Sequence, residues 1–172
     1  MRIAPPAALD PAIERDLFDA VDALQPELHA TLAALVRFPS LMGEEAPAQD
    51  FMAGLFRGMG LAVDRFEVRD ADLRDLPGYS PPTGHWARHD NVVGSHRPRD
   101  ATGRSLIFNG HIDVVPVGAE ALWTTPPFDP VIRDGRMYGR GSGDMKAGIA
   151  AYVTAFEALR RIGLQPAAPV WM

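Results

Sequence analysis

The stretch Leu106-Ile-Phe-Asn-Gly-His111-Ile-Asp113-Val-Val-Pro116 is the part of the chain around which the rest is organised. It begins with a continuous apolar run at residues 106–108, which is typical of a strand buried on both faces. His111 and Asp113 follow just past the end of this strand. Residues two apart in an extended chain project to the same side, so we expect the Asp113 carboxylate beside the His111 ring and Ile112 in apolar packing.

A second stretch, Gly139-Arg-Gly-Ser-Gly-Asp144, places another carboxylate at the start of a strongly patterned helix. Three glycines in five residues let the backbone take positive φ and come close to an ion, and a helix N-terminus keeps a carboxylate ionised. Together the two stretches indicate half of a metal site, with His111 and Asp144 as ligands and Asp113 fixing the imidazole tautomer. Taken singly, His111 and Asp113 suit a plain hydrogen-bonded pair, and Asp144 suits a helix N-cap.

The composition limits the classes of function. The 172 residues are 47% hydrophobic and 23% charged, which predicts one ordered domain spanning residues 1–172. A net charge of -5 gives no basic footprint for nucleic acid or for an anionic membrane surface. The absence of cysteine excludes thiolate ligands and suits the cytoplasm, and we expect neither a signal peptide nor a membrane span.

The spacing of apolar residues predicts helices alternating with strands. Helical periodicity covers residues 11–36, where Pro26 kinks the helix or starts a second one, and again residues 47–59. Strands are expected at residues 61–68, 91–94 and 106–108, with a surface loop at 69–88. His85 lies in this loop and His89 at its end, and we expect both histidines to be solvated. The pair Asp134-Gly135 predicts a hairpin over 130–138 that brings Asp144 back toward His111, before a helix from 145 and a buried strand starting at 170. This pattern predicts an α/β layered sheet.

Every basic residue except Lys146 is arginine. Either a compact ammonium is required at this position, or a lysine has been retained by chance in an arginine-biased composition.

The ordered set of motifs resembles the amino-terminal signature of a known enzyme family. The motifs are His111-x-Asp113-Val-Val-Pro, Trp123, Pro127-Phe128, Asp134-Gly135, Gly139-Arg-Gly and Asp144-Met-Lys. They resemble the metal-dependent amidohydrolases of peptidase family M20, which include acetylornithine deacetylase, succinyl-diaminopimelate desuccinylase, aminoacylase and carboxypeptidase G. The resemblance is faint through residues 35–40 and 91–93 and specific from Leu106 to Gly148. It implies a three-layer α-β-α domain with a mixed or mostly parallel sheet, incomplete here, and a cis peptide between Asp144 and Met145.

The resemblance also implies a chemistry. Members of this family use two metal ions, usually zinc with cobalt as an alternative, and a bridging water that attacks the amide of an N-acyl amino acid or a peptide. On the matching positions, His111 would be a ligand of one metal, Asp144 the carboxylate bridging both, and Asp113 the residue orienting His111. The family's general-base glutamate, its remaining ligands and the inserted domain through which many members dimerise have no counterpart in this sequence. We therefore expect the 172 residues alone to bind metal weakly and not to turn over substrate. We also expect the chain to be a truncated gene product, a misannotated reading frame or one piece of a longer protein.

Two other classes of function are weighed beside this one. The glycines at 139, 141 and 143 before a helix suggest nucleotide binding, but they match neither G-x-G-x-x-G nor the P-loop pattern. A non-catalytic interaction module is the third interpretation, because the apolar end of the chain at Trp171 and Met172 would leave a strand edge in need of a partner.

Overall fold

The computed structural model describes residues 8–81 and 90–172, so His85 and His89 lie outside the described residues. The elements in chain order are α1 (Pro11–Ala23), α2 (Gln25–Val36), α3 (Ala46–Gly58), β1 (Ala62–Glu67), α4 (Asp70–Leu73), β2 (Asp90–His96), β3 (Leu106–Ile107), a 3-10 turn (Glu120–Leu122), β4 (Val131–Arg133), β5 (Arg136–Tyr138), a π-helical segment (Ser142–Lys146), α5 (Ala147–Arg161) and β6 (Val170–Trp171). Pro26 stands in the first turn of α2, so of the two alternatives the second helix is confirmed.

The main sheet has the strand order β1-β2-β6-β3. β1 pairs with β2 and β2 with β6 in antiparallel orientation, whereas β6 and β3 are parallel. The α/β class and the mixed sheet are therefore confirmed. The alternative of a mostly parallel sheet is wrong, because two of the three strand pairings in the main sheet of the described residues are antiparallel. β1 lies at the edge of the sheet, as the alternation of residues 61–68 predicted.

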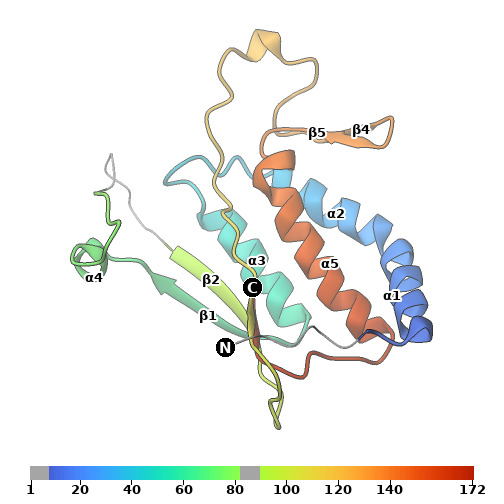
Figure 1. Ribbon diagram of the computed structural model, residues 1–172. Coiled ribbons are helices and arrows are strands. Elements are labelled where there is room, and N and C mark those ends of the chain that lie inside the picture. Colours follow the sequence, from blue (N-terminus) through green and yellow to red (C-terminus); the bar gives the residue numbers. More distant parts are fainter. Residues whose placement is uncertain (1–7, 82–89) are drawn as a thin grey trace.

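The hydrophobic core lies between the sheet and the helices α3 and α5, which pack on the same face (Figure 1). α3 comes so close to β2 that a Cβ at Gly94 would meet the Phe56 ring at 2.7 Å, so only glycine permits this packing. α1 and α2 pack in turn on α5. The fully or nearly fully buried members of the core are Leu35, Ala48, Met52, Phe56, Ile112, Ile149, Val153, Phe156, Val170 and Met172.

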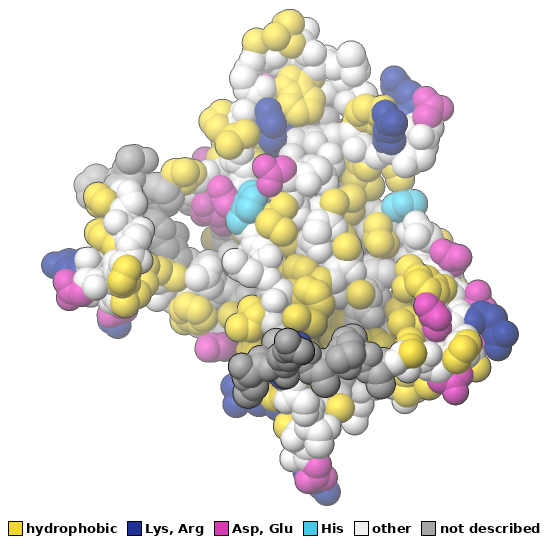
Figure 2. Space-filling view, viewed as in Figure 1, with side chains coloured by type: hydrophobic (Ala, Val, Ile, Leu, Met, Phe, Trp, Pro, Cys, Tyr) yellow, Lys and Arg dark blue, Asp and Glu magenta, His cyan; other side chains and the backbone are white. Residues whose placement is uncertain are grey.

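The prediction that the apolar run at 106–108 is buried on both faces is wrong. β3 lies at the second edge of the sheet, and Leu106 and Ile107 are 48% and 70% exposed. Only Phe108 turns inward, where its ring stacks on Tyr152 at 5.4 Å. Phe66 of β1 is also exposed, at 43%, and contributes apolar surface on the outer face of the sheet. The space-filling view shows hydrophobic side chains at the molecular surface (Figure 2).

The segment from 69 to 81 contains one helical turn, α4, where the sequence predicted only a loop. The predicted hairpin is confirmed as β4 and β5, with Asp134 at φ 51° and Gly135 at φ 71° in the turn. Positive φ at both central residues is the geometry that an Asp-Gly pair favours between two antiparallel strands. Among the described helices, none combines the length and the apolarity needed to cross a bilayer.

Candidate metal centre

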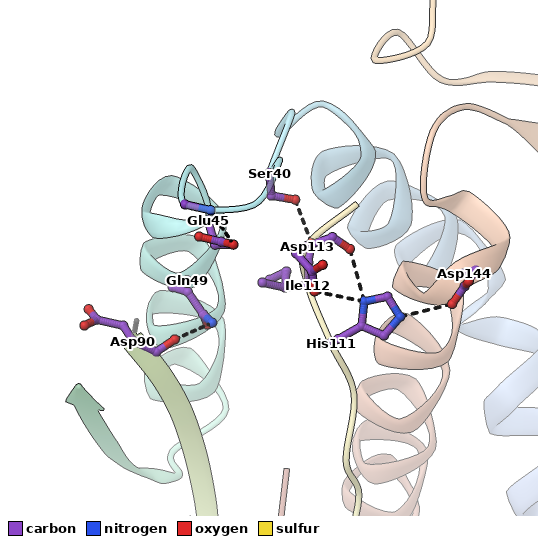
Figure 3. Close-up of polar contacts among 9 residues, drawn as sticks. Ser40, Glu45, Gln49, Asp90, His111, Ile112, Asp113 and Asp144 are labelled. Atoms are coloured by element: carbon purple, nitrogen blue, oxygen red, sulfur yellow. Dashed lines mark hydrogen bonds and ion pairs between the residues drawn. The ribbon is translucent and has the colours of Figure 1, made fainter. Parts of the chain in front are cut away.

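The structure brings together the three side chains that the sequence singled out (Figure 3). The Nε2 atom of His111 lies 3.0 Å from Oδ1 of Asp144. On the other side of the ring, Nδ1 lies 3.1 Å from the backbone oxygen of Asp113 and 3.2 Å from its Oδ1. A neutral imidazole carries a single N–H, so a ring with an acidic acceptor on each side requires either a proton or a metal cation at Nε2.

Asp144 reaches this position from an irregular backbone segment. It takes φ -134° and ψ 99° inside the π-helical segment, and its peptide bond to Met145 is cis, as the family resemblance implied. The interpretation of Asp144 as the helix N-cap is wrong, because Lys146 occupies that position. The Asp144 side chain is 92% exposed, so both of its oxygens are accessible from solvent.

The glycines before Asp144 allow close packing of the turn that carries it. Of the three glycines, only Gly141 has the predicted positive φ, at 77°. A Cβ at Gly141 would lie 2.5 Å from the Val114 side chain, and one at Gly139 would lie 2.6 Å from the Val36 side chain. At Gly139 and Gly141 the close approach is therefore to buried valines. The approach of this segment to an ion stays a prediction.

The extended chain at His111–Val114 is held by a segment that sequence reasoning did not single out. Ser40 is fully buried, and its hydroxyl donates a 2.6 Å hydrogen bond to the Ile112 carbonyl. The Val114 amide donates to the Ser40 carbonyl at 2.8 Å, so Ser40 is bonded on both sides of Asp113. Ile112 is 7% exposed in the core, which confirms that it points away from His111 and Asp113.

Lys146 is also fully buried, and its ammonium donates to the carbonyls of Leu35 and Phe38, both at 2.8 Å. Burial lowers the pKa of Lys146 to about 8, against the opposite effect of the nearby Asp113 charge, so the side chain is still an ammonium at pH 7. A buried charge without partners would cost several kcal/mol, and hydrogen bonds from a charged donor return about 1.5–3 kcal/mol each. These contacts favour the first of the two alternatives, a position that requires a compact ammonium.

Arg140 and Trp123 tie the long loop before the hairpin to the same region. The guanidinium lies over the Trp123 ring at 5.0 Å and donates to the Pro116 carbonyl at 3.2 Å. The indole N–H donates to the Val117 carbonyl at 2.9 Å. Trp123 therefore packs against Arg140 and is fixed to the backbone at Val117.

A pocket of about 460 Å³ adjoins the site and includes His111 and Asp113 in its wall. Its wall also includes the polar side chains of Glu45, Gln49 and Asn91. Gln49 is held by a 2.9 Å hydrogen bond from its amide to the Asp90 carbonyl. The His111 side chain is 47% exposed, so the imidazole is accessible from solvent.

The donor set fits part of a zinc site. Zinc binds nitrogen and carboxylate oxygen at about 2.0–2.2 Å with tetrahedral angles, which places two ligand atoms roughly 3.2–3.4 Å apart. The 3.0 Å between Nε2 of His111 and Oδ1 of Asp144 is within a few tenths of an ångström of that separation. Within residues 8–81 and 90–172, no group of three or more His, Asp and Glu side chains is arranged to hold a metal ion. A complete site needs further ligands from water or from another segment.

The pKa of His111 gives a testable expectation for the metal-free chain. Partial burial lowers this pKa, but the hydrogen bonds and charges of Asp144 and Asp113 raise it by more, so it lies above the usual 6.5. A raised pKa means that protonated His111 stabilises the fold below about pH 6.5, and that this contribution is lost as the pH rises through the folded-state pKa. We expect an NMR titration of the His111 ring to have its midpoint above 6.5, and Asp144→Asn to lower that midpoint. An unchanged midpoint in the variant would show that the two groups do not interact in solution.

Comparisons with known proteins agree with this geometry. Residues 107–172 match the sequence pattern of Peptidase family M20/M25/M40. The succinyl-diaminopimelate desuccinylase of Paracidovorax citrulli is 37% identical over 133 residues, which cover 77% of this chain and 31% of that enzyme. The chain spans less than a third of the length of the curated relatives it matches.

Solved structures show the same fold. A di-peptidase from Saccharomyces cerevisiae superposes with a TM-score of 0.73 at 19% identity, covering 91% of this chain and 33% of that protein. An M20 family metallo-carboxypeptidase from Sulfolobus solfataricus gives a TM-score of 0.65 at 20% identity, covering 84% and 29%. The chain therefore belongs to peptidase family M20/M25/M40, as the motifs from Leu106 to Gly148 predicted, and it corresponds to part of the length of its relatives.

Proposed function

We propose that this chain carries part of the catalytic centre of a metal-dependent amidohydrolase, which cleaves the amide bond of an N-acyl amino acid or a peptide. The observation that supports it is the His111 ring placed between two carboxylates, an arrangement that calls for a cation at Nε2. The relatives are a desuccinylase, a di-peptidase and a metallo-carboxypeptidase, and each of these activities breaks a carbon–nitrogen bond of the amide type.

In this proposal His111 would hold one metal ion through Nε2, and Asp144 would be the carboxylate shared by two ions. Asp113 orients the imidazole by accepting the Nδ1 proton, which leaves the Nε2 lone pair for the metal and makes it more basic. Zinc is the metal we propose, with cobalt as a substitute, because nitrogen and carboxylate donors suit both ions. Bound divalent cations would supply Lewis acidity toward a water and toward the amide carbonyl.

The remaining ligands and the general base would come from outside the described residues, which bring together one imidazole and two carboxylates at this site. The polar pocket beside His111 has a volume suited to a small molecule, which favours an N-acyl amino acid or a short peptide over a macromolecule. A single catalytic-domain portion spanning residues 1–172, a cytoplasmic location and dimerisation of the whole protein belong to the same proposal.

The test is an NMR titration of the purified chain with ZnCl2, CoCl2 and MgCl2, followed at the His111 side chain. We expect zinc to shift this resonance and cobalt to broaden it, and we expect magnesium to have little effect because it prefers oxygen ligands. A His111 resonance unmoved by millimolar zinc would contradict the proposal. In parallel, steady hydrolysis of N-succinyl-diaminopimelate, N-acetyl amino acids or dipeptides would contradict the expectation that the 172 residues alone lack turnover.

A further inference from the structure

The two halves of the candidate metal centre are joined by a short piece of chain that carries none of the ligands. This piece, residues 35–41, is called here the bridge segment, and it runs from the last turn of α2 to the loop before α3. It contacts the turn after Asp144 on one side and the extended chain at residues 112–114 on the other. Figure 3 shows the hydrogen bond from Ser40 to Ile112.

Lys146 makes the first of these connections. It follows Asp144 by two residues, and its ammonium bonds to the carbonyls of Leu35 and Phe38 in the bridge segment. Both carbonyls also accept a backbone N–H, from Phe38 and Ser40 respectively. The ammonium therefore binds carbonyls that already accept backbone hydrogen bonds within the bridge segment. The position of the ammonium consequently depends on the conformation of that segment.

Ser40 makes the second connection. Its hydroxyl and its carbonyl bond to Ile112 and Val114, on either side of Asp113. Leu41 continues the contact as an isolated parallel bridge to Val114. The bonds are short, at 2.6 and 2.8 Å, and Ser40 has no exposed surface, so water does not compete for them.

The two connections meet within two residues of each other, because the Phe38 carbonyl accepts from both Lys146 and the Ser40 amide. A continuous path of hydrogen bonds thus runs from Lys146 through Phe38 and Ser40 to Ile112. The stem of Lys146 also packs at the site of Gly141, where a Cβ would lie 3.4 Å from its Cδ and 2.5 Å from the Val114 side chain. The turn that carries Asp144 and the stretch from His111 to Pro116 are also joined directly, by the contact between His111 and Asp144 and by the hydrogen bond from Arg140 to the Pro116 carbonyl at 3.2 Å.

We propose that Lys146 and Ser40 are positioning residues of the metal centre, which act through the bridge segment to set the separation of His111 and Asp144. This role rests on the proposed function, because it concerns the geometry of two proposed ligands. Neither residue binds metal: the Lys146 ammonium is cationic, has no lone pair and donates to two carbonyls, and the hydroxyl of Ser40 donates to the Ile112 carbonyl. Loss of either residue would leave both ligands present but free to move apart.

The variants are Lys146→Met, which keeps the length of the side chain and removes the ammonium, and Ser40→Ala, which removes one hydroxyl. Thr154→Val is the matched control, because it removes another buried hydroxyl from α5, ten residues beyond Asp144. Hydrogen exchange at the Val114 amide, which bonds to Ser40, reports on the bridge segment without any metal. The Gly94 amide, which bonds to Met172 within the sheet, reports on general stability.

Lys146→Met is expected to speed exchange at Val114 by about tenfold or more relative to Gly94, although Lys146 makes no bond to Val114. Thr154→Val should affect both amides alike. The proposal would be overturned if the exchange rate of the Val114 amide were unchanged, or if it rose only as much as that of the Gly94 amide. Either result would show that Lys146 contributes only to general stability.

The second measurement is the affinity for CoCl2 at a temperature where each variant is folded by circular dichroism. Residues that support a ligand typically change metal affinity by about 10–100-fold, so each variant should bind cobalt at least tenfold more weakly and the control should not. The double variant should bind about as weakly as either single one, since both break the same path. Independent, multiplicative losses or unchanged affinities would overturn the proposal. A wild-type chain that binds no cobalt would instead contradict the proposed function, while the exchange data would still decide whether Lys146 acts on Val114.

Discussion

Replacing His111 by alanine is expected to lower the affinity of the chain for zinc and cobalt by a hundredfold or more. The imidazole is the only nitrogen donor at the site among the described residues, and Asp144 alone is a 92% exposed carboxylate that water and buffer cations can reach. Even residues that only support a ligand typically change metal affinity by about 10–100-fold, and loss of a ligand should exceed that range. A hundredfold loss corresponds to about 2.8 kcal/mol of binding free energy.

Isothermal titration with ZnCl2 checks this result, and His29→Ala is the matched control because His29 is an exposed histidine on α2. Asp144→Asn should also cause a large loss, since an amide oxygen does not neutralise the cation. Asp113→Asn should cause a smaller one, because the Asp113 backbone carbonyl still lies 3.1 Å from Nδ1 and can orient the ring. Equal affinity of wild type and His111→Ala would mean that any bound metal sits elsewhere.

Replacing Gly141 by alanine is expected to destabilise the fold by about 2–5 kcal/mol. The backbone at Gly141 has φ 77°, which costs an L-residue about 1–2 kcal/mol, and the new Cβ would lie 2.5 Å from Cγ1 of the buried Val114. Overpacking of this kind typically adds about 1–3 kcal/mol. Val114 is 4% exposed and paired with the bridge segment, so it has little freedom to move away.

Gly163→Ala separates the two causes. Gly163 has φ 74°, but a Cβ there would meet no atom within 4 Å, so only the backbone cost of about 1–2 kcal/mol should appear. Urea unfolding of both variants gives the comparison, and the difference between them measures the clash with Val114. Equal losses in the two variants would show that the turn at Gly141 relaxes without strain.

Local signals in the sequence were sufficient wherever neighbouring residues decide the structure. Asp134-Gly135 predicted the hairpin because few residue pairs accept positive φ at two consecutive positions. The position of Pro26 indicated either a kink or a new helix, of which the new helix is observed, and the alternation at 61–68 predicted an edge strand. The pairing of His111 with Asp113 was predictable for the same reason, because it depends only on the two-residue repeat of an extended chain.

The prediction for residues 106–108 failed because burial is a property of the whole sheet. An apolar run has the same sequence whether both faces are covered or one is open, and the exposed Ile107 lies on an edge strand whose outer face is uncovered among the described residues. The role of Ser40 was missed for a similar reason. A serine after proline gives no local sign that it bonds to a chain segment 72 residues away. Lys146 gave a sign, as the only lysine, but not the identity of its partners.

The sequence by itself determined the residues of the candidate metal centre, their order along the chain and the family to which the chain belongs, because motif spacing and residue chemistry are local properties. Only the tertiary structure decided that His111 and Asp144, 33 residues apart, come within 3.0 Å, and that residues 35–41 lie against both halves of the site. The physical reason is that these distances follow from close packing of Val114, Gly141 and Lys146, which no sequence pattern specifies.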